Sequence, residues 1–197
     1  MPRRWGRCNA ESSSGKIQGD NPRCTEGGQY ASHGRQGKGG AVLDHTGARA
    51  GQFVYRSFRR SGGIGIEALS RGASSVVLVE KSGYAASVIK GNLNKLHLEQ
   101  DDDIRLIKSG YDAALNALAD EGRKFDVIFM DPPYRMAHKA AVTAADIINE
   151  RDLLNDGGIF IVEHSSDLPF VTDVINMKLN RSCSYGLAVL TFFSKND

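Results

Sequence analysis

The stretch SGGIGIEALSRGASSVVLVEK, residues 61–81, reads as a glycine-rich turn, a helix and a strand in direct succession. Ile64, Ala68 and Leu69 fall on one face of the expected helix. Residues 74–81 form a β-branched run that is typical of a buried strand and ends in an acid. This unit predicts an α/β fold and places a turn and an acid where a ligand could bind.

The alternation of helices and strands continues to the C-terminus. Apolar spacing predicts helices over residues 82–98, 111–122 and 138–150, strands over 103–109, 125–134 and 157–165, and a hairpin over 181–193 that turns near Gly186. Strands that alternate with helices form a mostly parallel sheet, and the final hairpin would add an antiparallel strand.

Length and composition narrow the class of protein. A chain of 197 residues favours one domain with a sizeable core. No apolar run is long enough to span a bilayer, and the arginines near the N-terminus precede no apolar segment, so neither a membrane span nor a secretory signal is expected. Cys8, Cys24 and Cys183 form no CxxC pair, which favours a reducing compartment and no metal site.

Charge and glycine divide the chain unevenly. Residues 1–60 carry 11 Lys+Arg against 4 Asp+Glu and hold 11 of the 22 glycines, whereas the rest of the chain is net acidic. The sequence therefore predicts an irregular, basic arm over residues 1–52 and an ordered α/β domain over residues 53–197. The arm could bind nucleic acid or have no function of its own.

Two signals for a ligand lie at the ends of the first strands. In an open parallel sheet, ligands bind beyond the carboxyl ends of the strands. Gly62, Gly63 and Gly65 would let the backbone approach a ligand, or could simply shape a tight turn. Glu80 could accept hydrogen bonds from both hydroxyls of a ribose, or could be a solvated acid paired with Lys81.

The segment Asp131-Pro132-Pro133-Tyr134 is the most specific signal. An apolar run carries the chain through the sheet to an acid, and two prolines then fix the backbone and remove N–H donors. The Asp131 carboxylate and the Pro132 carbonyl can together accept both hydrogens of an exocyclic amine, while Tyr134 stacks on the ring. This arrangement suits methyl transfer to a base amine, although a rigid turn with a solvated acid is the simpler alternative.

The chain resembles the S-adenosylmethionine-dependent amino-methyltransferases, whose motif is (D/N)PP(Y/F). Within them it resembles the RsmD-type enzymes, which methylate guanine N2 in small-subunit ribosomal RNA, because GIGIEALSRGA, VVLVEK, FDVIFMDPPY, GGIFIVEHS and YGLAVLTFF occur in the same order. The resemblance implies a seven-stranded Rossmann-like sheet and a cytoplasmic monomer acting on ribosomal RNA or the small subunit. It implies a substrate site at Asp131, Pro132, Pro133 and Tyr134, and an S-adenosylmethionine site at Ser61, Gly62, Gly63, Gly65, Glu80, Lys81 and Tyr111.

Two departures separate this chain from that family. Arg56, Arg59 and Arg60 stand where the family has a strand acid and a loop of small residues, so the first strand is expected to be disrupted and cofactor binding weakened. Gly110 stands where the family usually has an acid near the adenine, and Asp112 is close but out of register.

A shift of reading frame would explain the arginines. Val54–Arg60 can be encoded so that the frame shifted by one base reads FTDLFAG, and residues 29–46 can likewise read STRPTADKVKEALFSII, similar to the family's N-terminal TRPT…KEALF segment. The hypothesis is that residues from before Gln29 to Arg60 are a frame-shifted version of that region. The coding DNA decides it.

Other functions compete with the guanine-N2 RNA methyltransferase. A DNA adenine or cytosine amino-methyltransferase would share the DPPY motif but usually carries a target-recognition domain, for which no stretch here is long enough. The altered loop instead favours a catalytically impaired methyltransferase fold that binds nucleic acid through its basic arm. Cofactor binding separates the two classes.

Overall fold

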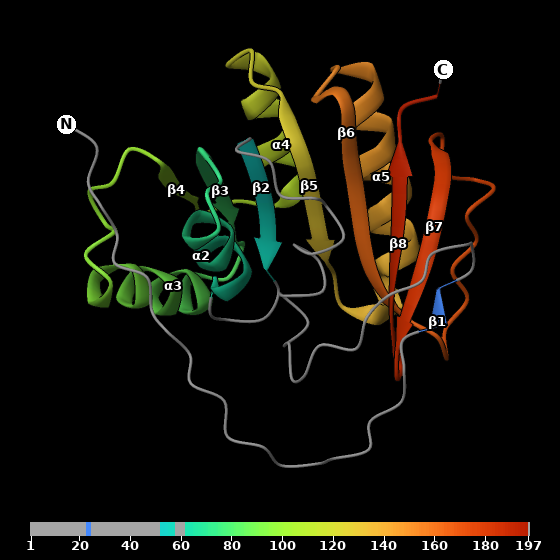
Figure 1. The fold of residues 1–197 in the computed structure, drawn as a ribbon, viewed down its shortest axis with the longest axis horizontal. Coiled ribbons are helices and arrows are strands. Elements are labelled where there is room, and N and C mark those ends of the chain that lie inside the picture. The colour runs from blue at the N-terminus through green and yellow to red at the C-terminus, as the bar shows by residue number, and fades with distance from the viewer. Residues whose placement is uncertain (1–22, 25–51, 58–61, 197) are drawn as a thin grey trace.

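The computed structural model describes residues 62–196 in full and the backbone of Arg23–Cys24 and Gln52–Ser57. These residues form one sheet in the order β1-β7-β8-β6-β5-β2-β3-β4 (Figure 1). The strands are β1 (Arg23–Cys24), β2 (Gln52–Ser57), β3 (Ser75–Val79), β4 (Ile104–Ile107), β5 (Phe125–Asp131), β6 (Leu154–Ser165), β7 (Lys178–Tyr185) and β8 (Ala188–Ser194).

The direction of the strands agrees with the sequence. The pairs β2–β3, β3–β4, β2–β5 and β5–β6 are parallel, whereas β8 runs antiparallel between β6 and β7. The β7–β8 hairpin turns at Gly186, whose φ of 60° lies in the left-handed region that glycine adopts without strain. The predicted α/β class and the C-terminal antiparallel strand are therefore confirmed.

The strand before Ser61 departs from expectation. Its arginines predicted a disrupted strand, yet β2 pairs along five residues with β3 and along five residues with β5. That prediction is wrong. A central parallel strand is held by backbone hydrogen bonds on both sides, and Phe53-Val54-Tyr55 have high strand propensity whatever follows them.

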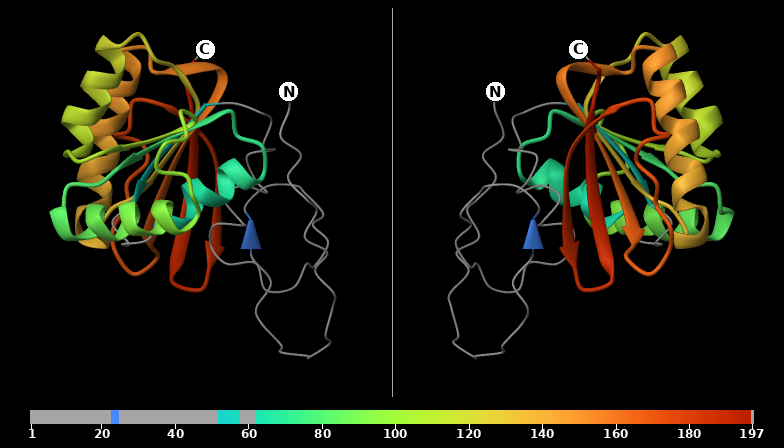
Figure 2. Two further views of the ribbon diagram at one scale, coloured as in Figure 1. Left: turned by 90° about the vertical axis from the view of Figure 1, so that its left-hand side faces the viewer. Right: turned by 90° about the vertical axis from the view of Figure 1, so that its right-hand side faces the viewer.

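Four helices and one short 3₁₀ turn of the described chain cover the sheet. These elements are α2 (Gly63–Ser70), α3 (Gly83–Lys95), α4 (Tyr111–Asp120), the 3₁₀ turn η1 (Tyr134–Met136) and α5 (Ala137–Glu150). The views along the sheet show α4 and α5 stacked against one face of it (Figure 2). Apolar residues of α2 and α3 belong to a second core cluster, on the opposite face.

Alternate residues of the inner strands serve the two core clusters. Val77 and Val79 of β3 pack with α4 and α5, whereas Val76 and Leu78 pack with α2 and α3. All four are at most 3 % exposed. A strand buried on both faces needs apolar residues at every position, which is why the run SVVLV lacks the alternation of a half-exposed strand.

The basic arm is described only at β1, where Arg23 and Cys24 pair with Ser184 and Cys183 of β7. This pairing makes the sheet eight-stranded, one strand more than the resemblance implied. Apart from Gln52, which begins β2, the rest of residues 1–52 lies outside the described residues, and with it most of the predicted irregular arm. Among the helices that are described, none has the length and apolar character to cross a membrane.

Candidate functional site

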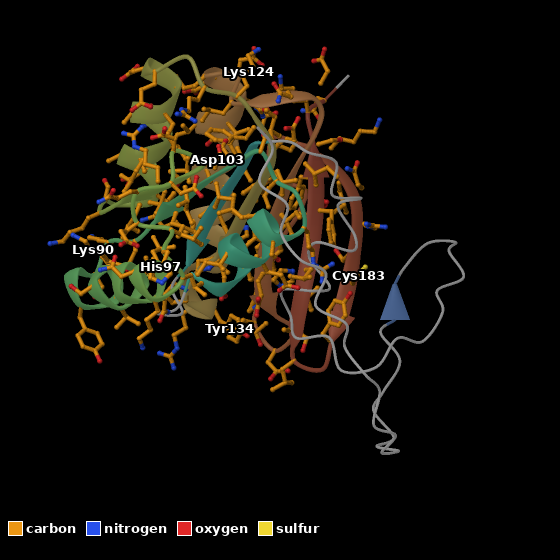
Figure 3. The ribbon with its side chains drawn as sticks, turned by 60° about the vertical axis from the view of Figure 1, so that its left-hand side comes forward. Lys90, His97, Asp103, Lys124, Tyr134 and Cys183 are labelled. Atoms are coloured by element: carbon orange, nitrogen blue, oxygen red, sulfur yellow. The ribbon has the colours of Figure 1, made fainter. Side chains whose placement is uncertain are left out.

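The candidate site lies along the carboxyl edge of the parallel strands. Tyr134, just beyond β5, is at the lower edge of the molecule, and Lys124, just before β5, is at the upper edge (Figure 3). In the sheet, Val79 pairs with Arg56, and Ser57 of the same central strand pairs with Asp131. Glu80 and Asp131 therefore flank the end of β2, two strand spacings or about 10 Å apart.

Glu80 is a buried acid with one oxygen in use. Its side chain is 5 % exposed, and Oε1 accepts a hydrogen bond of 2.7 Å from the Ser82 backbone N–H. Its own N–H donates to Ile107 O at 3.0 Å, which holds the residue against the end of β4. Oε2 is buried and has no hydrogen-bond partner among the residues that the structure describes. Since an unpaired buried acceptor is costly, this oxygen marks a position where a hydroxyl donor would bind favourably.

The glycines before and within α2 have different roles. Gly62 precedes the helix with a φ of 67°, a conformation that favours glycine. Gly65 lies against β3, where a Cβ would come within 2.5 Å of Leu78 Cδ2 and 2.9 Å of Val76 Cγ1. The absence of a side chain at Gly65 therefore leaves room for the core side chains of Leu78 and Val76. Gly62 and the exposed Gly63 are left as the turn that a ligand could approach, and Ser61 lies outside the described residues.

The chain after β4 runs beside Glu80 and then leads to a second acid, Asp112. The Ser109 N–H donates to Glu80 O at 3.1 Å, so the segment leading into α4 runs beside Glu80. A Cβ on Gly110 would lie 2.6 Å from Asp112 Oδ1, so the Asp112 carboxylate fills the space over the glycine. Tyr111 is partly buried against the α4–α5 core, and Lys81 is exposed.

The DPPY segment forms a compact turn at the end of β5. Asp131 is the last residue of the strand and is 5 % exposed. Pro132 is buried, and the Pro133 carbonyl accepts the Met136 N–H at 2.7 Å, which closes η1. The Tyr134 hydroxyl donates to Glu163 Oε1 at 3.3 Å. The acid of this turn, Asp131, is buried rather than solvated, unlike the acid in the simpler alternative drawn from the sequence.

Sequence reasoning assigned no role to the residues at the end of β6. Glu163 is 2 % exposed and His164 is 8 % exposed. The His164 ring stacks on Phe170 at 3.9 Å between centroids, and Phe170 meets the edge of His138 in the first turn of α5 at 6.0 Å. The sequence did contain a signal for these residues: an acid and a histidine follow an apolar strand segment, just as Glu80 follows β3.

His164 is a neutral link between β6 and the hairpin. Burial lowers its pKa below the usual value, although the Ser165 carbonyl and the charge of Glu163 oppose that shift. Its Nε2 lies 2.8 Å from Thr191 Oγ1, which in turn lies 2.9 Å from Ser182 Oγ. The polar chain crosses from β6 to β8 and β7, so the end of β6 is fixed to the strands beside it.

The carboxyl edge is therefore divided into two parts. At β3 and β4 an acid with a free acceptor lies beside a glycine turn. At β5 and β6 a buried acid, an aromatic ring and a second buried acid lie together. No group of three or more potential metal ligands occurs within residues 62–196. The chemistry available there is hydrogen bonding to hydroxyls and amines, together with stacking on a planar ring.

Comparison with known proteins shows that the chain matches a protein family and several related proteins. The family model described as "Conserved hypothetical protein 95" matches residues 49–194. Among curated relatives, the Bacillus subtilis protein called "Putative rRNA methyltransferase YlbH" is 31% identical over 138 residues, which are 70% of this chain and 73% of that protein. "Ribosomal RNA large subunit methyltransferase I" of Enterobacter sp. strain 638 is 37% identical over 123 residues. That match spans 58% of this chain but only 30% of the relative.

A solved structure agrees in fold. A conserved hypothetical protein of Streptococcus pyogenes superposes with a TM-score of 0.66 and 26% sequence identity, over 80% of this chain and 94% of that one.

Proposed function

Because the chain belongs to the family described as "Conserved hypothetical protein 95", we propose that it is an S-adenosylmethionine-dependent methyltransferase acting on ribosomal RNA, and that its target is the exocyclic N2 amine of a guanine. The observation that carries the proposal is the buried carboxylate of Asp131 at the end of β5, directly before Pro132, Pro133 and the partly buried ring of Tyr134. The RNA substrate is supported by the names of the curated relatives, and the amine by the DPPY segment.

The residues at β3 fit the cofactor. Glu80 offers a buried oxygen without a partner, which suits a ribose hydroxyl, beside the turn at Gly62 and Gly63. Asp112 over Gly110 would supply an acceptor near the base of the cofactor, in place of the acid that the sequence lacks at position 110. Lys81 and Tyr111 flank the two strand ends. When bound, S-adenosylmethionine supplies the electrophilic methyl group.

The residues at β5 would hold the nucleophile. The Asp131 carboxylate and the Pro132 carbonyl accept the two amine hydrogens, so the nitrogen lone pair is drawn out of conjugation with the ring. As the N–C bond forms, the nitrogen becomes positive, and a nearby carboxylate stabilises that charge more than it stabilises the neutral amine. The amine proton then leaves, with Asp131 as the nearest acceptor in this arrangement. Tyr134 stacks on the guanine.

A base must leave its stack to reach such a pocket, and this step is least costly in single-stranded or looped RNA. A ribosomal substrate would also agree with the cytoplasmic location proposed for the chain, in which Cys183 is buried. A target in large-subunit RNA is the second candidate, and the large-subunit relative favours it.

The test is transfer of labelled methyl groups by the chain with Arg59→Ala, Arg60→Gly and an acid at position 56, in which the expected repulsion of the cofactor is removed. The substrates are purified small-subunit RNA, large-subunit RNA and DNA, and nucleoside analysis follows. We expect N2-methylguanosine from small-subunit RNA and nothing from DNA. Label in large-subunit RNA alone would replace the small-subunit target, and a methylated base carbon would overturn the amine. No label in any substrate, with RNA still bound, would favour the impaired nucleic-acid-binding protein.

A further inference from the structure

We propose that Glu163 is a positioning residue: it holds the Tyr134 ring at the angle at which a target base can stack, and thereby sets RNA engagement. The inference rests on the proposed function for its substrate, but its structural half stands on contacts within the chain. Glu163 lies on β6, 29 positions after Tyr134, so the contact exists only because β5 and β6 pair.

The contact is directional. The Tyr134 hydroxyl is a donor, and Glu163 Oε1 accepts from it at 3.3 Å. Tyr134 begins η1, a short turn held by the bond from Met136 N–H to Pro133 O, so its backbone is already fixed on one side of the ring. The hydroxyl bond fixes the opposite end. A phenol ring held at both ends has little freedom left, and stacking then costs less ordering entropy on binding.

The burial of Glu163 makes it a rigid anchor. It is 2 % exposed, and its neighbour His164 is fixed on both sides, by Phe170 and by Thr191. An exposed acid would lose most of its hold on a hydroxyl to competing water, whereas one in a low-dielectric setting bonds strongly. Because β6 is paired with β5 and β8, Glu163 has no freedom to follow the ring.

The experiment compares Glu163→Ala and Glu163→Gln with Tyr134→Phe and the double variant Glu163→Ala/Tyr134→Phe. RNA affinity is measured by fluorescence anisotropy on a small-subunit RNA transcript, and ring mobility by NMR of ring-labelled tyrosine, with Tyr134 assigned from the Phe variant. Asn155→Ala is the matched control, since it removes a partly buried side-chain hydrogen bond between β6 and β5, to Asp126, without touching Tyr134, Glu163 or His164.

Glu163→Ala should loosen the Tyr134 ring and weaken RNA binding by roughly tenfold, the order expected for one hydrogen bond to a charged acceptor. Glu163→Gln, which keeps an acceptor oxygen, should restore most of both properties. In the Tyr134→Phe background the further change to Ala at position 163 should matter little, because the two residues act through one contact. Asn155→Ala should lower the melting temperature and leave both readouts unchanged.

The outcomes separate the two proposals. An unchanged Tyr134 ring in Glu163→Ala overturns the positioning role. So do additive effects in the double variant, which would show that Glu163 acts through general stability. A loosened ring with unchanged RNA affinity overturns the role in RNA engagement. A chain with Arg59→Ala and Arg60→Gly that binds S-adenosylmethionine and the transcript but methylates no ribosomal RNA contradicts the proposed function, while the ring signals still decide the positioning role.

Discussion

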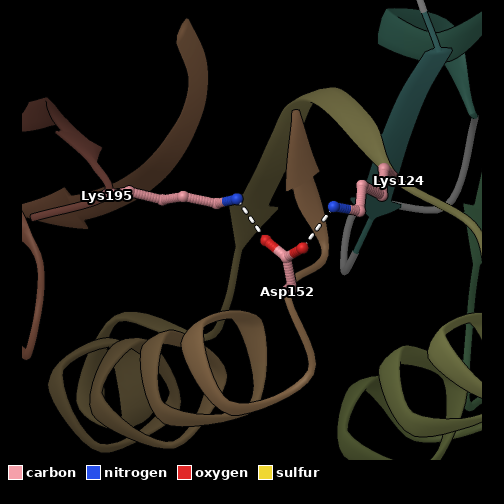
Figure 4. Close-up of polar contacts among 3 residues, drawn as sticks. All are labelled: Lys124, Asp152 and Lys195. Carbon is pink, nitrogen blue, oxygen red and sulfur yellow. Dashed lines mark hydrogen bonds and ion pairs between the residues drawn. The ribbon is translucent and has the colours of Figure 1, made fainter. Parts of the chain in front are cut away.

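The acidic residues at the two edges of the sheet differ in burial and in their partners. At the carboxyl edge, Glu80, Asp131 and Glu163 are each at most 5 % exposed. At the opposite edge, Asp152 has a side chain that is 56% exposed and bonds to both Lys124 and Lys195 (Figure 4). Acids with cations beside them in solvent need no further partner. A buried acid with an unpartnered oxygen, such as Glu80, is costly unless a ligand completes it, so the edges separate binding from scaffolding.

The largest effect is expected at Arg59 and Arg60, which follow β2 in the sequence and lie outside the described residues. Two like charges about 5 Å apart at an effective dielectric of 20 repel by about 3 kcal/mol, or roughly a hundredfold in affinity. Changing Arg59→Ala and Arg60→Gly, with an acid at position 56, should therefore strengthen S-adenosylmethionine binding by that order in calorimetry. Equally tight binding by the unaltered chain would contradict the repulsion. Sequencing the coding DNA tests the frame-shift hypothesis separately.

The next largest effect is expected for Asp131→Ala, introduced into the Arg59→Ala/Arg60→Gly chain that binds the cofactor. Loss of a charged hydrogen-bond acceptor costs about 1.5–3 kcal/mol, and if this appears mainly in the transition state the rate falls roughly ten- to 150-fold. Single-turnover methylation of ribosomal RNA measures it. Affinity for the cofactor should hardly change, because Asp131 is assigned to the base. Full activity in Asp131→Ala would mean that the DPPY segment is only a rigid turn.

Glu80→Gln tests the cofactor half of the same edge. The amide keeps an oxygen for the Ser82 N–H but loses the charge that holds hydroxyls, so cofactor affinity should fall by about tenfold. The free protein should be no less stable in thermal unfolding, since the substitution relieves a buried charge that lacks a partner. The matched control is Asp152→Asn at the other edge, which should leave cofactor affinity unchanged. Unaltered affinity in Glu80→Gln would remove Glu80 from the cofactor site.

Gly65→Ala separates packing from binding within α2. Its new Cβ would meet Leu78 Cδ2 at 2.5 Å, and overpacking of this kind costs about 1–3 kcal/mol. Gly91→Ala in α3 is the control, because its Cβ would meet nothing within 4 Å, and it should stabilise the helix by about 0.5–1 kcal/mol. Urea unfolding measures both. A stable Gly65→Ala that loses cofactor binding would assign this glycine to the ligand after all.

The sequence predicted the parts of this site that depend on local pattern. Apolar runs identified β3 and β5 as buried strands, and the residues that follow such strands fall at the carboxyl edge. The burial of Glu80 was not predictable, because Glu followed by Lys at a strand end fits a solvated pair equally well. The burial of Glu80 also depends on the neighbouring strand β4, whose end is hydrogen-bonded to the Glu80 backbone.

Long-range pairing decided the remaining differences. The bond from Tyr134 to Glu163 joins residues that no local pattern connects. The arginines near β2 led to the wrong prediction of a disrupted strand. Side-chain composition says little about a strand whose backbone is paired on both sides. Gly62, Gly63 and Gly65 formed one motif in the sequence, yet Gly65 admits Leu78 and Gly62 adopts a left-handed turn.

The smallest effect is expected at Asp152, which joins the end of α5 to the start of β5 and the end of β8. Hydrogen bonds from Lys124 and then Lys195 lower its pKa from an ordinary 3.8 to about 2. A depressed carboxyl pKa stabilises the fold above the unfolded value and stops doing so as pH falls through the folded value. The contribution is therefore complete above about pH 4 and lost near pH 2. Because Asp152 is exposed and screened by solvent and salt, we expect only a slight loss of stability in Asp152→Asn.

Asn is the appropriate substitution because Asp152 has a φ of 51°, a conformation that Asn tolerates. Urea unfolding of wild type and Asp152→Asn should differ slightly at pH 7 in low salt and converge as pH falls to about 2 or as salt rises. A difference that survives both conditions would mean that Asp152 acts through its backbone turn. In that event the backbone turn at Asp152, and not its ion pairs, would stabilise the opposite edge. The acids of the two edges would then differ only in how deeply they are buried.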